Sequence, residues 1–156
     1  MLSVKIKKCR DGAVIPQYAT DGSACFDLHA CFDWEEPYCD NVYYLSEHEI
    51  GVVINTGLKF EIPEGHVMMI YSRSGHGFTH NVRLANCVGV IDSDYRGEVK
   101  VKLNMDDNYG DEVLIIHHGD RIAQAMIIPV QQVKFEEVSE LSDTERGTGG
   151  LGSTGK

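Results

Sequence analysis

A single carboxylate, Asp92, stands at the end of an apolar run and is followed by a short polar turn. The run is Val88 to Ile91, and Tyr95 and Gly97 lie in the turn that precedes Val99. This pattern predicts two strands joined by a tight polar hairpin. A rigid strand end can aim one carboxylate into a shared space, as a general base requires. The same residues also fit an ordinary solvated turn.

Two further segments have the chemistry to bind phosphate. Residues Ser72 to Gly75 follow an apolar run and bring an arginine, hydroxyls and a glycine amide to a strand end, where together they could hold a polyphosphate. In the segment Gly119 to Ala125, a charged turn precedes an apolar strand, and Gln124 supplies a neutral donor. For Asp120 and Arg121 in that turn, an ordinary ion pair is the favoured interpretation.

The segment from Arg146 to Gly155 contains five glycines and one apolar residue, so it cannot form a core of its own. A flexible tail is the plain interpretation of such a terminus. A glycine-rich run flanked by arginine, serine and threonine can also wrap a phosphate, because its backbone N–H groups approach closely and its hydroxyls add donors. The spacing is not that of a Walker A loop.

One more carboxylate, Asp27, lies between apolar neighbours in the segment Ala24 to Ala30. A carboxylate in such a strand is either buried with a hydrogen-bonded partner or placed in the outer shell of a metal. The sequence spacing leaves both interpretations open.

Short strands are the elements that must position these side chains. Apolar or alternating runs are separated by glycine, proline and aspartate turns, which indicates an all-β sandwich, jelly roll or barrel. One short helix is expected near Arg73 to Ala85, although Gly75 and Gly77 weaken it. The expected strands are Val4 to Lys8, Gly51 to Thr56, Val67 to Tyr71, Val88 to Ile91, Val99 to Leu103, Val113 to Ile116 and Ile122 to Val130.

Composition narrows the classes of protein that the chain could be. A length of 156 residues with 42% hydrophobic and 24% charged residues fits one soluble domain. The formal net charge of -10 weighs against nucleic acid as a partner, because phosphate neutralisation supplies most of that affinity. The start of the chain has no long apolar core, so we expect neither a signal peptide nor a membrane partner, and a cytoplasmic location. Five cysteines without a C-x-x-C pair fit reduced thiols.

Taken together, five ordered segments resemble the five motifs of the homotrimeric dUTP pyrophosphatase (dUTPase) family. The third and fifth are the most specific, and the match runs from about Tyr18 to the C-terminus. The resemblance implies a jelly-roll-like β domain over residues 1–140 and a flexible, phosphate-closing tail over residues 141–156, in agreement with the strand pattern. The five segments are Ala24 to Ala30, Arg73 to Gly75, Gly89 to Glu98, Gly119 to Ala125 and Arg146 to Gly155.

The resemblance implies an enzyme, a dUTP diphosphatase, which hydrolyses dUTP to dUMP and pyrophosphate, keeps uracil out of DNA and supplies dUMP. Asp92 would be the general base that activates the water attacking the α-phosphate. Tyr95 would stack beneath the deoxyribose and leave no room for a 2′-hydroxyl. A closed backbone edge would reject cytosine and thymine, because donors and acceptors would be left unpaired or the 5-methyl group would clash. The residues implied to read uracil are Asn86, Gly89, Val90 and Ile91.

The phosphate contacts are implied in the same way. One active site would combine motifs from three subunits of a homotrimer. Asp27 would orient waters on a Mg²⁺ that the triphosphate itself chelates. The residues implied for the α- and β-phosphates are Arg73, Ser74, Gly75 and Gln124. The tail residues implied to close over the substrate are Arg146, Leu151, Gly152, Ser153 and Thr154.

The chain departs from the family pattern in four places. Leu151 stands where a phenylalanine commonly stacks on uracil, Ser72 replaces a proline, and Cys25 stands where a small glycine is common. The segment from Cys31 to Ile50, which contains the single tryptophan, is longer than expected. None of these departures removes a catalytic group.

Two alternatives remain open from the sequence. A related dCTP deaminase would share the fold and would use a glutamate on the strand that leaves the hairpin, where Glu98 is close by and Lys102 holds roughly that position. A nucleotide-sensing protein would use the same site together with a second, protein-binding surface on Cys31 to Ile50.

Overall fold

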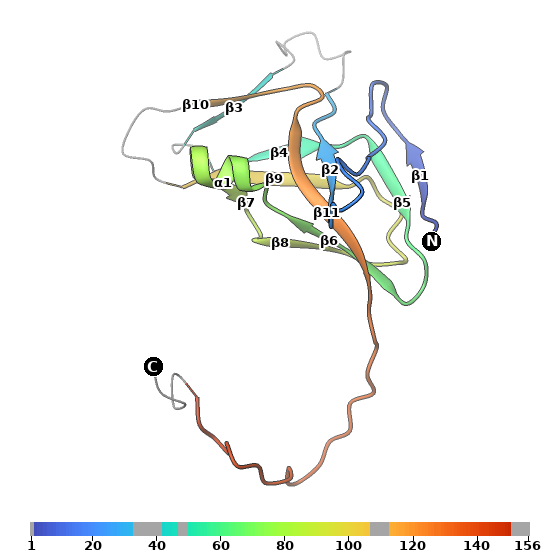
Figure 1. The fold of residues 1–156 in the computed structure, drawn as a ribbon, viewed down its shortest axis with the longest axis vertical. Helices are drawn as coiled ribbons and strands as arrows, with labels where there is room; N and C mark the ends of the chain where they lie inside the picture. The colour runs from blue at the N-terminus through green and yellow to red at the C-terminus, as the bar shows by residue number, and fades with distance from the viewer. Residues whose placement is uncertain (1, 33–41, 47–49, 107–112, 151–156) are drawn as a thin grey trace.

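The computed structural model describes residues 2–32, 42–46, 50–106 and 113–150. Over these ranges it is built from short antiparallel strands and one short helix, α1 (Ser74–His80) (Figure 1). Within the same ranges no helix is long and apolar enough to cross a membrane. The strands in chain order are β1 (Lys5–Lys8), β2 (Phe26–His29), β3 (Val42–Ser46), β4 (Val52–Asn55), β5 (Leu58–Glu61), β6 (His66–Tyr71), β7 (Val82–Leu84), β8 (Val88–Ile91), β9 (Lys100–Met105), β10 (Val113–His117) and β11 (Arg121–Pro129).

Four groups of paired strands make up the folded body. A four-stranded sheet has the order β2-β11-β6-β8, and a three-stranded sheet has the order β4-β9-β7. Two ribbons, β1-β5 and β3-β10, complete the body, and every pair is antiparallel. The result is all-β, as the strand pattern predicts, and jelly-roll-like, as the resemblance implies.

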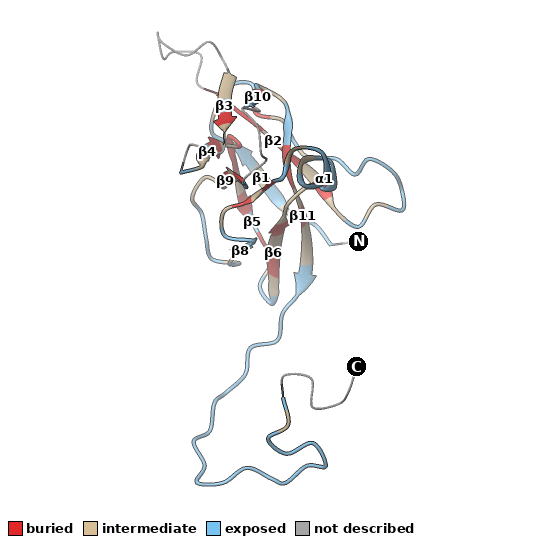
Figure 2. Ribbon diagram, turned by 90° about the vertical axis from the view of Figure 1, so that its left-hand side faces the viewer, coloured by how far each residue is buried: buried red, intermediate tan, exposed pale blue. Residues whose placement is uncertain are grey.

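Alternation along the strands explains why they enclose one core. On β9, Val101, Leu103 and Met105 are buried, whereas Lys100 and Lys102 are exposed. The same period of two places one face of each inner strand against the core and the other toward solvent. Among the described residues, nearly all buried hydrophobic side chains belong to one cluster inside the body (Figure 2).

After β11 the chain leaves the body as a long arm (Figure 1). Residues 131–150 are exposed apart from Gly149 (Figure 2). Apolar side chains along this arm face solvent, and Phe135 is 91% exposed. The division into a domain of residues 1–140 and a tail of residues 141–156 stays a prediction.

The expected strands are found at or close to their predicted positions, but the predicted hairpin around Asp92 is wrong. Strand β8 pairs with β6, whereas β9 pairs with β4 and β7. The segment between Ile91 and Lys100 therefore passes from one sheet to the other. A local pattern of apolar runs and turn residues identifies strands but does not say which strands pair.

Strands β3, β5 and β7 are not among the strands expected from the sequence. Strand β3 lies within the long segment Cys31 to Ile50 and pairs with β10, with Tyr44 opposite Ile115. The rest of that segment between residues 33 and 41 and between 47 and 49, including Trp34 and Tyr38, lies outside the described residues.

The expected helix is present but shorter than the range Arg73 to Ala85. It ends at Asn81, which has φ 52° and ψ 31°, the left-handed conformation that closes many helices. Asparagine tolerates this conformation better than most residues, and its backbone N–H donates to the carbonyl of His76. The chain then turns directly into β7.

Helix α1 carries a histidine, His76, whose Nδ1 atom is buried with no hydrogen-bond partner within the described structure. Burial lowers the pKa of His76 below its ordinary value of 6.5, and the charges of Arg73 and His80 lower it further, while Asp120 opposes them. The folded protein therefore holds this ring neutral at pH values where the unfolded chain already binds a proton.

We expect His76→Leu to raise the free energy of unfolding at pH 7 by about 1 kcal/mol, because it removes an unsatisfied buried polar atom. The substitution should also make the free energy of unfolding depend less on pH. A depressed pKa means that stability is full above pH 6.5 and is lost as the pH falls through 6.5 toward the lower folded value. Urea unfolding at pH 7.5, 6.5 and 5.5 measures both effects. Equal pH dependence in the two proteins would show that His76 does not titrate in this way.

Candidate active site

The predicted phosphate residues Arg73 and Gln124 come together with Asp27, which was predicted to orient waters on Mg²⁺, at one end of the four-stranded sheet. Gln124 on β11 lies opposite Asp27 on β2 and opposite Tyr71 on β6, so three neighbouring strands meet there. The Gln124 side chain donates through Nε2 to the carbonyl of Ser72 at 2.9 Å. This bond fixes the start of the segment that carries the arginine.

Charge is concentrated at this end of the sheet. The Arg73 Nε atom donates to Asp27 Oδ1 at 3.0 Å, and the Arg121 guanidinium lies 3.5 Å from the other carboxylate oxygen. Arg73 also donates to the carbonyl of Arg121 at 3.3 Å. Two guanidinium groups share one carboxylate, so this cluster keeps one positive charge in excess. Such a cluster is suited to a phosphate.

Beside the cluster lies an open depression of about 390 Å³. Ser74 and Gly75 are exposed at the start of α1, and a Cβ atom placed on Gly75 would meet nothing within 4 Å. There is room here for phosphate oxygens to approach the backbone. The depression is lined by Ser72, Arg73, Ser74, Gly77, Phe78 and Gln124.

Asp92 lies elsewhere. It directly follows β8, it is exposed, and it lines a broad hollow of about 1090 Å³ together with Asp94 and Arg96. On the sheet, Val88 is paired with Tyr71, and Asp92 comes four residues after Val88. At the rise of an extended strand, this places Asp92 about 13 Å along the sheet from the phosphate end. One chain therefore does not unite the predicted base with the predicted phosphate residues.

Gly89, Val90 and Ile91, which are expected to read a base, lie on β8, one of the two edge strands of its sheet. One side of β8 pairs with β6, and its other side is left without a strand partner in the described residues. Gly89 faces the core, where a Cβ atom would lie only 3.1 Å from the Cβ of Ile70. Val90 faces outward, and Asn86 is exposed in the turn before the strand. An edge strand offers backbone N–H and C=O groups to a ligand.

Tyr95 is held near the middle of the segment after Asp92. Its hydroxyl donates to the carbonyl of Glu98 at 3.1 Å, while the side chain remains 44% exposed. The ring lies over Gly97, where any Cβ atom would overlap the ring and its hydroxyl. Glycine at position 97 is therefore what leaves space for the aromatic side chain.

Comparison with known proteins decides the family. A dUTPase family model matches residues 11–155. The chain belongs to the dUTPase family. The deoxyuridine 5′-triphosphate nucleotidohydrolase of Nautilia profundicola is 46% identical over 155 residues, which cover 99% of this chain and 100% of that protein.

Solved dUTPase structures share the fold. A Staphylococcus bacteriophage 80alpha dUTPase with dUPNHPP has a TM-score of 0.80 and 23% identity, and the match covers 100% of both chains. The dUTPase of the S. aureus phage phi11, described with a structural Mg(II) ion, has a TM-score of 0.72 and 20% identity over 89% of this chain and 98% of that chain. At these identities the likeness concerns the fold.

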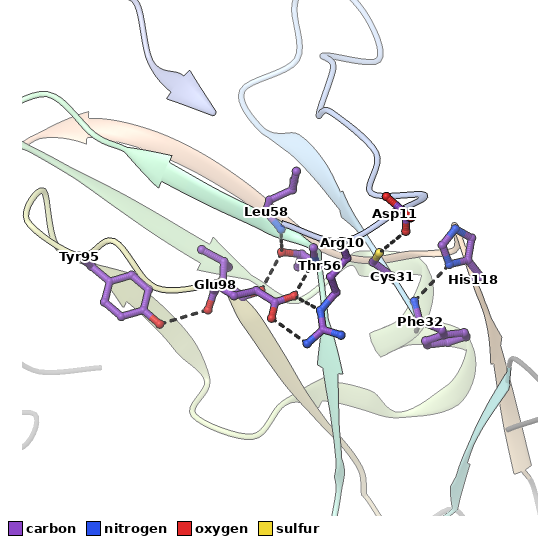
Figure 3. Close-up of polar contacts among 11 residues, drawn as sticks. Arg10, Asp11, Cys31, Phe32, Thr56, Leu58, Tyr95, Glu98 and His118 are labelled. Atoms are coloured by element: carbon purple, nitrogen blue, oxygen red, sulfur yellow. Dashed lines mark hydrogen bonds and ion pairs between the residues drawn. The ribbon is translucent and has the colours of Figure 1, made fainter. Parts of the chain in front are cut away.

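Within this dUTPase, Glu98 is engaged in structural contacts. Its carboxylate accepts from Arg10 Nε at 2.6 Å and Nη2 at 3.0 Å, and from the backbone N–H of Gly57 at 2.9 Å (Figure 3). A carboxylate with these three donors is poorly placed to move a proton on a substrate base. The geometry therefore gives no support to the deaminase alternative.

The tail residues of the fifth dUTPase motif are described only up to Gly150. Arg146 lies in a turn, where its Nε atom donates to the carbonyl of Gly149 at 2.9 Å. Within the described residues, Arg146 forms no hydrogen bond or ion pair with the phosphate cluster. Leu151, Gly152, Ser153 and Thr154 lie outside the described residues.

Two residues of this dUTPase were missed or misread from the sequence. Arg121 was expected to pair with its neighbour, but it lies against Asp27, whereas Asp120 accepts from the backbone N–H of His117 at 2.7 Å. The register of β11 against β2 shifts between Arg121 and Ala123, so a regular alternation along the strand could not have predicted this contact. Arg10 had no local signal, because its partner Glu98 is 88 residues away.

Proposed function

We propose that this dUTPase hydrolyses dUTP to dUMP and pyrophosphate with Asp92 activating the water that attacks the α-phosphate. Membership of the family makes the protein a dUTP diphosphatase. The observation that carries the mechanism is the exposed Asp92 carboxylate at a strand end that opens into a hollow large enough for a nucleotide. A general base acts within hydrogen-bond reach of its water, so the phosphates must be brought to this carboxylate.

The residues that bind the phosphates come from another copy of the chain. Asp92 and the Asp27–Arg73–Gln124 cluster lie at opposite ends of β6 and β8, about 13 Å apart along the sheet. Bringing together Asp92 of one protomer and the cluster of a second unites the base with the phosphates. The assembly we propose is a homotrimer with shared sites. The solvent-facing apolar side chains of the arm, among them Phe135 and Leu141, support contact with a neighbouring copy.

Base selection is assigned to β8 and the turn before it, and sugar selection to the segment that follows Asp92. The free edge of β8 at Gly89, Val90 and Ile91, with the Asn86 side chain, reads the uracil edge. A backbone edge of fixed donors and acceptors rejects a base whose pattern leaves them unpaired. Tyr95 packs against the deoxyribose and excludes a 2′-hydroxyl by its bulk.

Magnesium fits this site as a companion of the substrate. No group of three or more histidine, cysteine, aspartate or glutamate side chains gathers in the described part of the chain. Asp27 is already shared by Arg73 and Arg121, and its remaining acceptor positions suit the waters of a metal carried by the triphosphate. When bound, Mg²⁺ neutralises phosphate charge that develops during the reaction.

We assign the glycine-rich tail the role of a lid over the active site. Arg146 together with Leu151, Gly152, Ser153 and Thr154 closes over the end of the triphosphate once the substrate is bound. A segment that becomes ordered only when it closes over the substrate excludes water during the reaction and releases the product when it opens. The protein works in the cytoplasm, where it keeps uracil out of DNA and supplies dUMP.

Gly97→Ala tests the sugar assignment. The added Cβ atom overlaps the Tyr95 ring, so the ring must move and lose its bond to the Glu98 carbonyl. We expect the preference for dUTP over UTP in kcat/KM to fall by about 10- to 10²-fold, as for a small misplacement of a contact group. Steady-state kinetics with both substrates measures this. An unchanged preference would place sugar selection elsewhere.

Pyrophosphate release from dUTP, UTP, dCTP and dTTP with magnesium tests the function as a whole, with the product bases separated by chromatography. We expect release from dUTP, giving dUMP, and little from the other three. Conversion of dCTP into a uracil nucleotide would assign deamination instead. Binding of dUTP without release of pyrophosphate would favour a nucleotide sensor.

A further inference from the structure

The segment that carries Asp92 and Tyr95 is held firmly at its ends. It begins at Ile91, which is paired with Met68 in the four-stranded sheet. It ends at Val99, whose N–H donates to the carbonyl of Leu58 at 2.9 Å. Between these points Tyr95 and Asp92 are exposed, so the position of the Tyr95 ring depends on a small number of contacts.

Glu98 supplies the contact that holds the Tyr95 hydroxyl, through its backbone carbonyl at 3.1 Å. The side chain of the same residue is fixed from the opposite direction by Arg10, which approaches both carboxylate oxygens, at 2.6 and 3.0 Å (Figure 3). A two-point pair of this kind sets the orientation of both groups, which a single contact does not. The side chains are only 20% and 12% exposed.

The turn between β4 and β5 forms hydrogen bonds with both Glu98 and Val99. The N–H of Gly57 donates to Glu98 at 2.9 Å, and the hydroxyl of Thr56 donates to the carbonyl of Val99 at 2.7 Å (Figure 3). Arg10 is tied to the same turn, because the N–H of Cys9 donates to the carbonyl of Gly57 at 2.8 Å. The N-terminal segment thus reaches the segment that carries Tyr95 by a short chain of direct bonds.

We propose that Arg10 is a positioning residue for sugar discrimination, which acts by holding Glu98 so that the Glu98 carbonyl holds the Tyr95 hydroxyl. The inference rests on the proposed function, because it uses Tyr95 as the group that excludes a 2′-hydroxyl. Arg10 itself does not contact the substrate. Its loss leaves Asp92 and the phosphate cluster in place but loosens the Tyr95 ring.

Arg83 provides a matched control. Its Nε atom donates to both carboxylate oxygens of Asp106, at 2.7 and 3.0 Å, whereas Arg10 uses two nitrogens to reach the two oxygens of Glu98. That pair is exposed, at 41% and 51%, and it lies between β7 and the end of β9. Within the described residues, Arg83 forms no hydrogen bond with the segment that carries Tyr95. Arg83→Met removes an arginine–carboxylate pair without touching the chain of bonds to Tyr95.

The test compares Arg10→Met, Arg10→Lys and Arg83→Met with the unmodified full chain. Two readouts are used, the ratio of kcat/KM for dUTP to that for UTP, and hydrogen exchange of the amides from Asp92 to Val99. We expect Arg10→Met to lower the ratio by about 10- to 10²-fold, the scale of a small misplacement, and to speed exchange in this segment. Arg10→Lys should give a ratio between those of Arg10→Met and the unmodified protein, because lysine keeps the positive charge but lacks the two-point geometry of the guanidinium group. Arg83→Met should change neither readout.

The outcomes separate the inference from the proposed function. If the unmodified protein prefers dUTP and Arg10→Met keeps the same ratio, the inference is overturned while the function stands. If the unmodified protein releases no pyrophosphate from dUTP, the function fails, and equal exchange in Arg10→Met and Arg83→Met would then overturn the positioning role as well. Should Arg10→Met fail to fold, Glu98→Gln replaces it. This variant keeps an acceptor for Gly57 but weakens the pair, and a ratio equal to that of the unmodified protein would again overturn the inference.

Discussion

Asp92→Asn is expected to bind dUTP as the unmodified protein does but to lose turnover by a factor of about 10²–10⁴, the contribution of a general base. The amide has nearly the size of the carboxylate and keeps one acceptor oxygen, but it cannot take a proton from water. Because Asp92 is exposed at a strand end and lines an open hollow, the change should leave the fold intact. Single-turnover kinetics and equilibrium binding of dUTP separate the two effects.

Asp94 provides the control for this change. It lies two residues further along, it is exposed, and it lines the same hollow. Asp94→Asn alters the local charge by the same amount, so it should reproduce any effect that is merely electrostatic. Turnover of Asp92→Asn within a few-fold of that of Asp94→Asn would remove Asp92 from the role of base.

Arg73→Met is expected to lower kcat/KM for dUTP by about 10- to 10²-fold, because hydrogen bonds to a charged group contribute roughly 1.5–3 kcal/mol each. The methionine keeps an apolar stem of similar length and removes the guanidinium. The Asp27 carboxylate then keeps Arg121 as its cationic neighbour at 3.5 Å. Loss of phosphate binding should raise KM for dUTP and should weaken binding of pyrophosphate, which calorimetry measures.

Arg83→Met again serves as the comparison, since it removes an arginine of an exposed ion pair. Arg73→Lys adds a second comparison, because lysine keeps the charge without the two-point geometry. We expect kcat/KM for dUTP to decrease from the unmodified protein to Arg73→Lys and then to Arg73→Met. A pyrophosphate affinity that is equal in Arg73→Met and Arg83→Met would exclude Arg73 from the phosphate site.

The sequence predicted the elements of this fold better than their pairing. The apolar run from Val88 to Ile91 is the strand β8, with the predicted bounds. Its expected partner was the next strand along the chain, but its actual partner is β6, with Met68 opposite Ile91. Periodicity reports which face of a strand is buried, whereas pairing is decided by tertiary packing of segments that are distant in the chain.

The same limit applies to the site. Asp92 and Arg73 could be singled out from their places beside apolar runs, and the ordered motifs strengthened both. Their location at opposite ends of one sheet depends on the register of β6 against β8, which no local pattern contains. Arg10 and Glu98 form their pair across 88 residues, and only the folded chain shows that the two belong together.

The central claim is that one active site takes Asp92 from one copy of the chain and Arg73 from another. Its most direct test mixes Asp92→Asn chains with Arg73→Met chains in equal amounts, by refolding them together. If the sites are shared in a closed trimer, about one quarter of them receive an intact residue at both positions, so the mixture should recover about a quarter of the activity of the unmodified protein. A mixture that is no more active than the two variants measured separately would contradict shared sites and would require Asp92 and Arg73 to act within one chain.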